Sequence, residues 1–282
     1  MTSTSSQNGK AFEYLACKAL LQLPGAKATN RTLGKQERDA HSLLSLKPGD
    51  RQYLAFSSQF LADYVRSQSI GDFEVDRPND SAGEDGDPSD LTLITPARRL
   101  RISLKNANFS IKHQRPSALA RHLGFENGTV EANSWESLYK SAVSKFFQYL
   151  EPEQKTISAS DIDSEMLYAD INLPACQYIN EVSTRISTAA SSMYDFLVGP
   201  EGLIIATASK KGVTLSRWSY ERKPSQVIAT LKGDGIDLAF SNGHIFHLRL
   251  HTADSTLNVH SPSLKWDTRS DSPMSLVARK SF

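Results

Sequence analysis

Asp90 and Lys105 are the residues whose types and spacing best suit chemistry on a phosphate. Asp90 precedes the apolar run 91–94, and Lys105 ends the alternating run 102–105, with a turn signal at Pro96 between them. If the two runs pair as strands, the carboxylate and the ammonium meet at one edge of a sheet. A carboxylate there can bind Mg²⁺ through one or two oxygens, and an ammonium can stabilise charge on a phosphate under attack.

Two neighbours of Lys105 could share in this site. Ser103 lies two residues before Lys105, so both side chains should face the same side of the strand. Leu104 should face the other side, but its backbone carbonyl could serve as a metal ligand. On the spacing alone, a surface hairpin with ordinary charges is the better explanation of this pattern.

Glu13 is an acid within a helix-forming run, residues 10–23, that ends at Pro24. At about 100° per residue, Glu13 points away from the side on which Lys10 and Lys18 cluster. Two interpretations remain open. Glu13 either turns inward to help hold a metal, or is a partly exposed acid that pairs with one of these lysines.

The charges are separated along the chain although they nearly cancel. The 282 residues carry a formal net charge of +1, and 22% of them are charged. Acidic residues concentrate in 72–90, whereas 98–121 holds seven Lys and Arg residues and no acid. A balanced total can therefore conceal a basic face next to an acidic metal site, which is an arrangement suited to nucleic acid.

Helical and strand-like patterns follow one another along the chain. Helices are expected at 10–23, 36–46, 51–70, 135–150 and 175–197. After residue 199 the chain reads as short strands separated by Gly, Asp-Gly and Asn-Gly turn signals. With 39% apolar residues, this pattern predicts an α+β protein with a sizeable core, either as one domain or as a core with a β-rich appendage.

Cysteine content and hydropathy exclude several classes. Cys17 and Cys176 are too few and too far apart for a zinc site or a disulfide framework, so two buried thiols are expected. The polar N-terminus lacks a secretory pattern, and no run approaches the roughly 18 apolar residues of a membrane helix. We therefore expect a soluble, cytoplasmic protein without a membrane partner.

Three separated motifs carry a resemblance to a known family. The run ISLKNANFSIKHQRPS, residues 102–117, is similar without gaps to the I-S-x-K-H-N-H-x-A-V-K-H-S-R-L-S signature of HaeIII-like type II restriction endonucleases. Residues 6–20 resemble that family's N-terminal G-x-A-F-E-Y helix, which brings Glu13 into register, and 246–269 resemble its C-terminal segment. The PSD…SLK pattern resembles the PD-(D/E)xK nuclease core, with Ser103 where an acid usually stands.

The resemblance implies a fold and an activity. It implies one restriction-endonuclease domain over 1–282, with a mixed central sheet flanked by helices, a helical and catalytic core in 1–155, and a helix and β-rich DNA-binding part in 156–282. The expected activity is Mg²⁺-dependent hydrolysis of double-stranded DNA at a short, GGCC-like site. The expected partners are DNA, a second copy of the chain for double-strand cleavage, and a cognate DNA methyltransferase that protects the host site.

The resemblance also assigns residues to roles. The catalytic residues would be Asp90, Lys105, Ser103 and Glu13, and the metal ligands would be Asp90, Glu13 and Leu104, with Asp87 as the alternative acid. Lys and Arg can neutralise phosphates, while Arg and Asn can contact base edges. The expected DNA contacts are Asn106, Asn108, Lys112, His113, Arg115, Arg249, His251 and Lys265.

Departures from the family pattern leave a second function open. Asn106 and Asn108 stand where the family usually has histidines, and Ser103 cannot supply a metal carboxylate. A sequence-specific DNA-binding protein that has lost cleavage would fit the absent acid, although the presence of Asp90 and Lys105 argues against it. A methyltransferase is disfavoured because no Gly-rich cofactor loop precedes Pro174-Ala175-Cys176.

Overall fold

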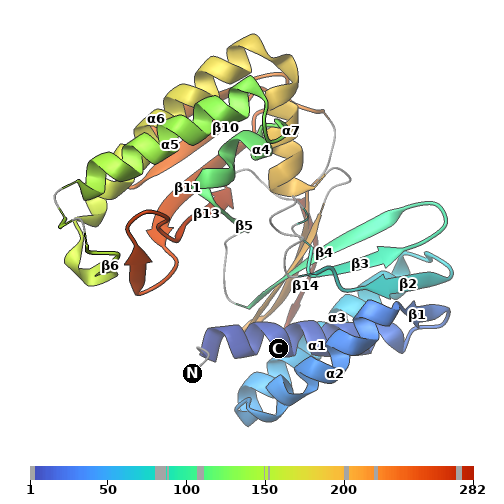
Figure 1. The fold of residues 1–282 in the computed structure, drawn as a ribbon. Helices are drawn as coiled ribbons and strands as arrows, with labels where there is room; N and C mark the ends of the chain where they lie inside the picture. The colour runs from blue at the N-terminus through green and yellow to red at the C-terminus, as the bar shows by residue number, and fades with distance from the viewer. Residues whose placement is uncertain are drawn as a thin grey trace.

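The computed structural model describes residues 4–79, 87, 89–106, 111–148, 150–151, 153–199, 203–218, 222–270 and 275–282. These residues form two lobes, each with its own main sheet and its own apolar cluster (Figure 1). Asn108 is outside the described residues, so its predicted DNA contact stays a prediction.

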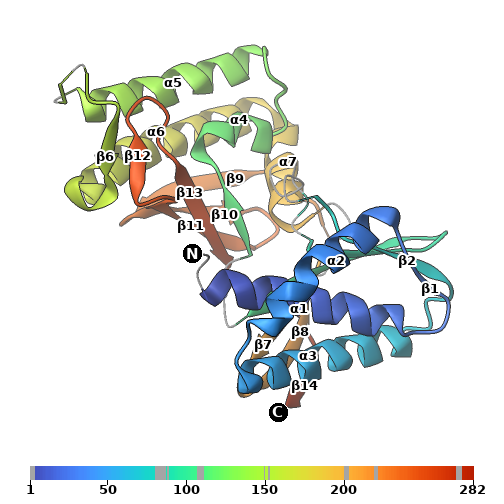
Figure 2. The ribbon, with the colours of Figure 1, turned by 60° about the horizontal axis from the view of Figure 1, so that its bottom comes forward.

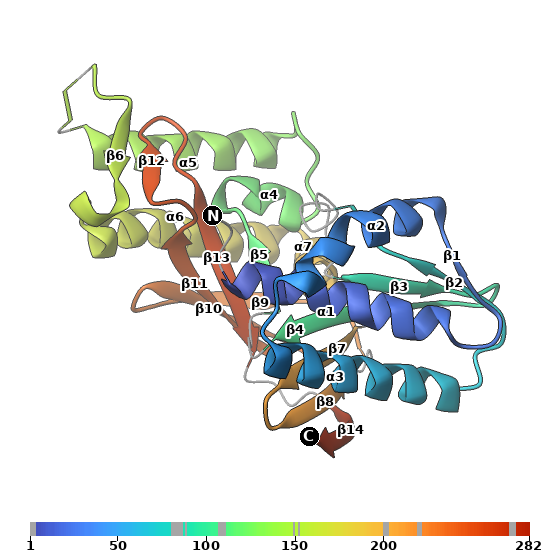
Figure 3. The same cartoon turned by 90° about the horizontal axis from the view of Figure 1, so that it is seen from below.

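The first lobe contains a seven-stranded mixed sheet with three helices. Its elements are α1 (Thr4–Leu21), β1 (Ala26–Ala28), α2 (Asn30–Leu44), α3 (Pro48–Ser67), β2 (Phe73–Asp76), β3 (Leu91–Ile94), β4 (Arg99–Asn106), β7 (Ile204–Ser209), β8 (Gly212–Arg217) and β14 (Ser275–Ser281). The strand order is β1-β2-β3-β4-β7-β8-β14, in which β1–β2 and β4–β7 are parallel pairs and the others antiparallel. Helices α1 and α3 pack together beneath the sheet, and α2 lies along α1 (Figure 3).

The second lobe contains a five-stranded antiparallel sheet covered by helices. Its elements are β5 (Lys112–Gln114), η2 (Pro116–Ala118), α4 (Leu119–His122), α5 (Val130–Phe147), β6 (Thr156–Ser158), η3 (Ala159–Asp161), α6 (Ser164–Arg185), α7 (Ser187–Val198), β9 (Val227–Lys232), β10 (Gly235–Phe240), β11 (Ile245–Thr252), β12 (Thr256–Asn258) and β13 (Leu264–Ser270). The strand order is β5-β13-β11-β10-β9, and β6 pairs separately with β12. Helix α6 packs on β9, β10 and β11, and α5 packs on α6 (Figure 2).

Alternation along the strands explains why this second sheet has one buried and one open face. Phe246, Leu248 and Leu250 of β11 are fully buried, and Trp266 of neighbouring β13 joins the same cluster. The residues between them in β11 and β13 are polar or charged and at least partly accessible to solvent. Because side chains alternate between the faces of a strand, the polar residues share the face turned away from the helices.

The predicted α+β class and mixed central sheet are confirmed. The two apolar clusters, however, do not divide at residue 155. Strands β7, β8 and β14 belong to the first sheet although they come late in the chain, and β5, η2, α4 and α5 belong to the second lobe although they come early. The chain therefore passes between the lobes several times, so the two lobes are not successive halves of the sequence.

Several predicted elements differ in extent. The expected helix 175–197 is two helices, α6 and α7, separated at Ile186, whose φ of −124° and ψ of 102° are extended. Helix α6 begins earlier than predicted because Asp163 caps it by accepting from Met166 N. Helix α3 buries Leu54, Leu61 and Val65 completely, whereas most of its aromatic side chains are only partly buried.

Candidate active site

The β3–β4 hairpin brings Asp90 and the predicted strand 102–105 together as expected. Asp90 N donates to Ile102 O at 2.9 Å, and a turn closed by Thr95 N donating to Arg98 O connects the strands. Asp90 Oδ2 accepts from Leu104 N at 2.6 Å and from Ser103 Oγ at 3.1 Å. The hairpin register thus fixes the carboxylate immediately before the start of β3.

The Leu104 carbonyl is directed towards the same strand edge as the Asp90 carboxylate. In a strand, the N–H and C=O of one residue point to the same side, and the Leu104 N–H points to Asp90. Strand β3 begins only at Leu91, so Leu104 lies beyond its paired register. The role of Leu104 as a metal ligand stays a prediction, and the backbone direction is compatible with it.

A buried arginine binds Glu13 at the wall of the same site. Arg77 Nη2 donates to Glu13 Oε2 and to Asp39 Oδ2, both at 2.7 Å, and Arg77 Nη1 donates to Gln36 Oε1 at 2.9 Å. The Arg77 and Asp39 side chains are 1% and 2% exposed, and that of Glu13 is 29% exposed. Glu13 therefore faces inward, paired with an arginine that follows β2.

Glu13 and Asp90 line the same cavity, and the charge of Asp90 acts on Glu13. The pKa of Glu13 is raised to about 7, because burial and the negative charge of Asp90 together raise it more than Arg77 lowers it. Two carboxylates that repel each other favour either a shared proton or a cation between them. For Asp39, burial also works to raise the pKa, but hydrogen bonds from Arg38 and Arg77 hold that pKa below its usual value.

A cavity of about 340 Å³ joins these groups to the second lobe. From the first lobe it is lined by Glu13, Lys35, Pro78, Asn79, Asp87, Ser89, Asp90 and Lys105, and from the other side by Ile111, His113, Gln114, Arg115, Ala118, Arg121, His122 and Lys265. Among the described lining residues, all three carboxylates come from the first lobe, whereas three of the five Lys and Arg residues come from the second. The cavity therefore has an acidic wall opposite a basic one.

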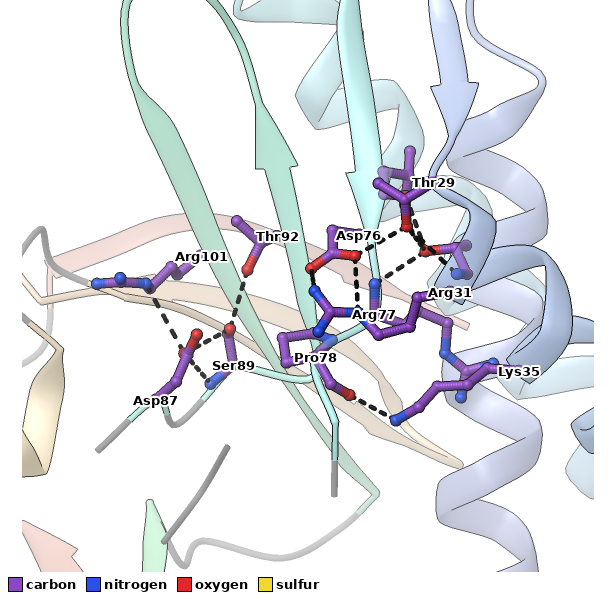
Figure 4. A network of polar contacts seen from close by, with 12 residues as sticks. Thr29, Arg31, Lys35, Asp76, Arg77, Pro78, Asp87, Ser89, Thr92 and Arg101 are labelled. Atoms are coloured by element: carbon purple, nitrogen blue, oxygen red, sulfur yellow. Dashed lines mark hydrogen bonds and ion pairs between the residues drawn. The ribbon is translucent and has the colours of Figure 1, made fainter. Parts of the chain in front are cut away.

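Asp87 reaches the cavity but is occupied differently from Asp90. Its Oδ1 accepts from Ser89 N at 3.0 Å and from Ser89 Oγ at 2.6 Å, and Arg101 Nε lies 3.7 Å away (Figure 4). The Asp87 carboxylate is therefore hydrogen-bonded to Ser89 and paired with Arg101 of β4. Asp90, whose charge acts on Glu13, is the acid better placed to share a cation with Glu13.

The predicted DNA contacts divide into several groups. His113, Arg115 and Lys265 line the cavity, which is compatible with their predicted contacts to DNA. Asn106 does not line it, because its Oδ1 accepts from Tyr53 Oη of α3 at 2.7 Å, on the opposite side of β4 from Lys105. For Lys112, only the backbone position in β5 is described.

The two remaining predicted contacts lie on β11 outside the cavity lining. Arg249 Nε donates to Asp234 Oδ2 at 2.6 Å, and the Arg249 side chain is 64% exposed. His251 lies 3.2 Å from Asp267, which His113 also contacts. Burial lowers the pKa of His113, and Asp267 opposes this effect. His251 therefore belongs to a histidine–aspartate cluster on the open face of the second sheet.

Sequence reasoning missed four residues that shape the cavity, namely Lys35, Arg77, Arg121 and His122. Lys35 Nζ donates to Pro78 O (Figure 4), and His122 is buried and stacked on Phe196 with ring centroids 3.7 Å apart. Of these four residues, only Arg121 could have been found from the sequence, because it ends the acid-free basic segment 98–121. Arg77 stands among loop-forming residues, where nothing local indicates burial.

No protein-family model matches the chain, and no curated protein matches it significantly. Among the residues described, no helix is both long and apolar enough to cross a membrane.

Proposed function

We propose that this chain is a Mg²⁺-dependent DNA endonuclease of the type II restriction class, built on a restriction-endonuclease-like core. The observation that carries the proposal is the convergence of Glu13, Asp90 and Lys105 on one cavity whose opposite wall is basic. Three separated sequence motifs, through their resemblance to HaeIII-like enzymes, support the same activity.

The residues present fit a Mg²⁺ ion. Glu13 and Asp90 offer the carboxylate oxygens that Mg²⁺ prefers. A cation would also relieve the repulsion by Asp90, which adds to the larger effect of burial in raising the Glu13 pKa. Both described hydrogen bonds to Asp90 use Oδ2, and among the described residues Oδ1 accepts none. When bound, Mg²⁺ would stabilise phosphate charge and supply a water of lowered pKa.

The chain's own residues would position DNA and stabilise charge. Lys105 would neutralise charge that develops on the phosphate, and Ser103 and the Leu104 N–H would hold the Asp90 carboxylate in place. Arg115 and Lys265 would contact the DNA backbone or bases from the other wall. The proposed recognition site is GGCC-like. Cleavage of both strands would use two copies of the chain. The enzyme would act in the cytoplasm of a host whose methyltransferase modifies the same site.

One observation favours a second function. Ser103 is fully buried and occupies the position of the usual second acid, which fits a sequence-specific DNA-binding protein without cleavage. To separate the two functions, the pure protein is incubated with phage DNA, with and without Mg²⁺. Discrete fragments that require Mg²⁺ support the endonuclease, whereas a gel shift without fragments supports the binding protein.

Site variants tie any cleavage to this cavity. Asp90→Ala and Lys105→Ala should each lower cleavage by about 100-fold or more, because each removes a charge next to the phosphate. Matched controls are Asp63→Ala and Lys27→Ala, which alter exposed residues of α3 and β1 and should cleave normally. Cleavage by either site variant within about tenfold of the wild type would show that the site is misassigned.

A further inference from the structure

Three strands of the second sheet bring two imidazoles and a carboxylate together on its open face. His113 of β5 is directly opposite Asp267 of β13, and His251 of β11 is opposite Lys265, two residues from Asp267 on the same strand. Residues directly opposite each other share a face, as do residues two apart in one strand. One potential ligand atom from each of His113, His251 and Asp267 lies within 4.8 Å of the other two.

The hydrogen bond of His251 determines which of its nitrogens is available. His251 Nδ1 lies 2.9 Å from Thr252 O, and because a carbonyl oxygen only accepts, Nδ1 carries the proton. Neutral His251 therefore has its lone pair on Nε2, which is shielded from solvent and has no hydrogen-bond partner among the described residues. A histidine whose other nitrogen donates to a backbone carbonyl is the arrangement typical of a metal ligand.

The Nε2 lone pair of His251 faces a carboxylate. Asp267 Oδ1 lies 3.2 Å from His251 Nε2, and His113 Nδ1 contacts the same oxygen. Two acceptor atoms at this distance repel each other unless a cation or a proton lies between them. Ligands of a tetrahedral zinc ion, bound at about 2.0–2.2 Å, are themselves about 3.3–3.6 Å apart, close to the separation of His251 Nε2 and Asp267 Oδ1.

We propose that His113, His251 and Asp267 bind a single first-row transition-metal ion, best matched by Zn²⁺, with water completing its coordination. Two imidazoles and one carboxylate suit such ions, whereas Mg²⁺ prefers oxygen ligands alone. The ion would link the three-residue strand β5 to β13 and β11 and so stiffen the basic wall of the cavity, which His113 lines. This site is separate from Glu13 and Asp90 and does not depend on the proposed cleavage.

Metal content tests the site directly. The full-length protein, freed of any histidine tag and treated with chelator, is dialysed against Zn²⁺ and then against metal-free buffer, and bound metal is measured by mass spectrometry. One Zn²⁺ per chain is expected, and Co²⁺ in its place should give the visible absorption of a tetrahedral site. A wild-type protein that retains no Zn²⁺ would overturn the proposal and leave a shared proton to explain the cluster.

Variants identify the ligands by a measurement other than cleavage. His251→Gln and Asp267→Asn should each lose at least about 10-fold in Zn²⁺ affinity, because each removes one ligand or its charge. Exposed His260→Gln is the matched histidine control, and Asp90→Asn should keep Zn²⁺ while losing cleavage. Circular dichroism checks that each variant folds. Undiminished Zn²⁺ affinity in both folded ligand variants would place the metal elsewhere and refute this assignment.

Discussion

Arg77 donates from Nη2 to Glu13 Oε2 at 2.7 Å, so a guanidinium that is almost fully buried holds the carboxylate of α1 at the cavity wall. The same nitrogen also donates to Asp39 of α2 at 2.7 Å. Arg77 thus connects two helices to the end of β2, and the position of Glu13 depends on this connection.

Replacing Arg77 should therefore lower the stability of the folded protein, in addition to any effect on cleavage. Among the described residues, Arg77→Ala leaves the buried Asp39 carboxylate paired with Arg38 alone, and breaking a buried ion pair costs about 3–5 kcal/mol in the free energy of unfolding. Arg66→Ala, which removes an exposed ion pair with Asp63, should cost at most about 1 kcal/mol. Urea denaturation of both variants measures the difference, and equal losses would contradict the structural role of Arg77.

The raised pKa of Glu13 predicts how Mg²⁺ binding depends on pH. Because this pKa is about 7, Glu13 is partly protonated at neutral pH, and binding of a cation to the carboxylate should displace the proton. Affinity for Mg²⁺ should therefore rise with pH up to and just above 7, with proton release at neutral pH. Calorimetry in two buffers of different ionisation heat measures that release, which Glu13→Gln should abolish. Release of the same size in Glu13→Gln would assign the proton to another group.

The same shift has a consequence for stability without Mg²⁺. The folded state raises the Glu13 pKa from about 4.5 to about 7, so it binds more protons than the unfolded chain between these values. Stability should consequently decrease as pH rises through this window, because the buried carboxylate must ionise. Glu13→Gln should show a smaller decrease. Identical pH profiles of the free energy of unfolding for wild type and variant would exclude a raised Glu13 pKa.

Ser103 should act by positioning Asp90. Ser103→Ala removes the hydrogen bond from Ser103 Oγ to Asp90 Oδ2 but leaves that from Leu104 N. A single such bond is worth about 0.5–1.5 kcal/mol, so cleavage should fall only about 2- to 10-fold. Single-turnover cleavage rates at saturating Mg²⁺ measure this effect beside Asp90→Ala. A loss as large as that of Asp90→Ala would make Ser103 a group required for the reaction itself.

Variants of the basic segment 112–115 should distinguish residues that position DNA from residues that recognise its sequence. Arg115→Ala should cost about 1–3 kcal/mol, mainly at the cognate site, if Arg115 contacts a guanine. Lys112→Ala should weaken binding to all DNA alike and reduce the salt dependence by about one unit, if Lys112 contacts a phosphate. Binding is measured with Ca²⁺ in place of Mg²⁺ at several salt concentrations.

Arg185→Ala is the control for these two variants, because Arg185 lies exposed at the end of α6 and pairs with Glu181. It should bind DNA as the wild type does. Unchanged affinity and unchanged salt dependence in both Arg115→Ala and Lys112→Ala would remove this segment from the DNA interface and shift attention to Lys265 on β13.

Local patterns determined the part of the site that lies within one hairpin. The apolar run 91–94, the turn signal at Pro96 and the alternation in 102–105 are short-range features, so the sequence predicted β3 and the neighbouring part of β4 correctly. For Glu13, helical periodicity distinguished its side of α1 from that of Lys10 and Lys18, but it left open whether the carboxylate turns inward or pairs with one of these lysines.

Tertiary structure decided everything that depends on contacts between distant segments. Arg77 is buried only because Glu13 and Asp39 arrive from two other elements, and β5 exists as a strand because β13, far along the chain, pairs with it. The meeting of His113, His251 and Asp267 follows from that pairing. Strand register between remote segments depends on the packing of the whole core, so no local pattern of residues contains this information.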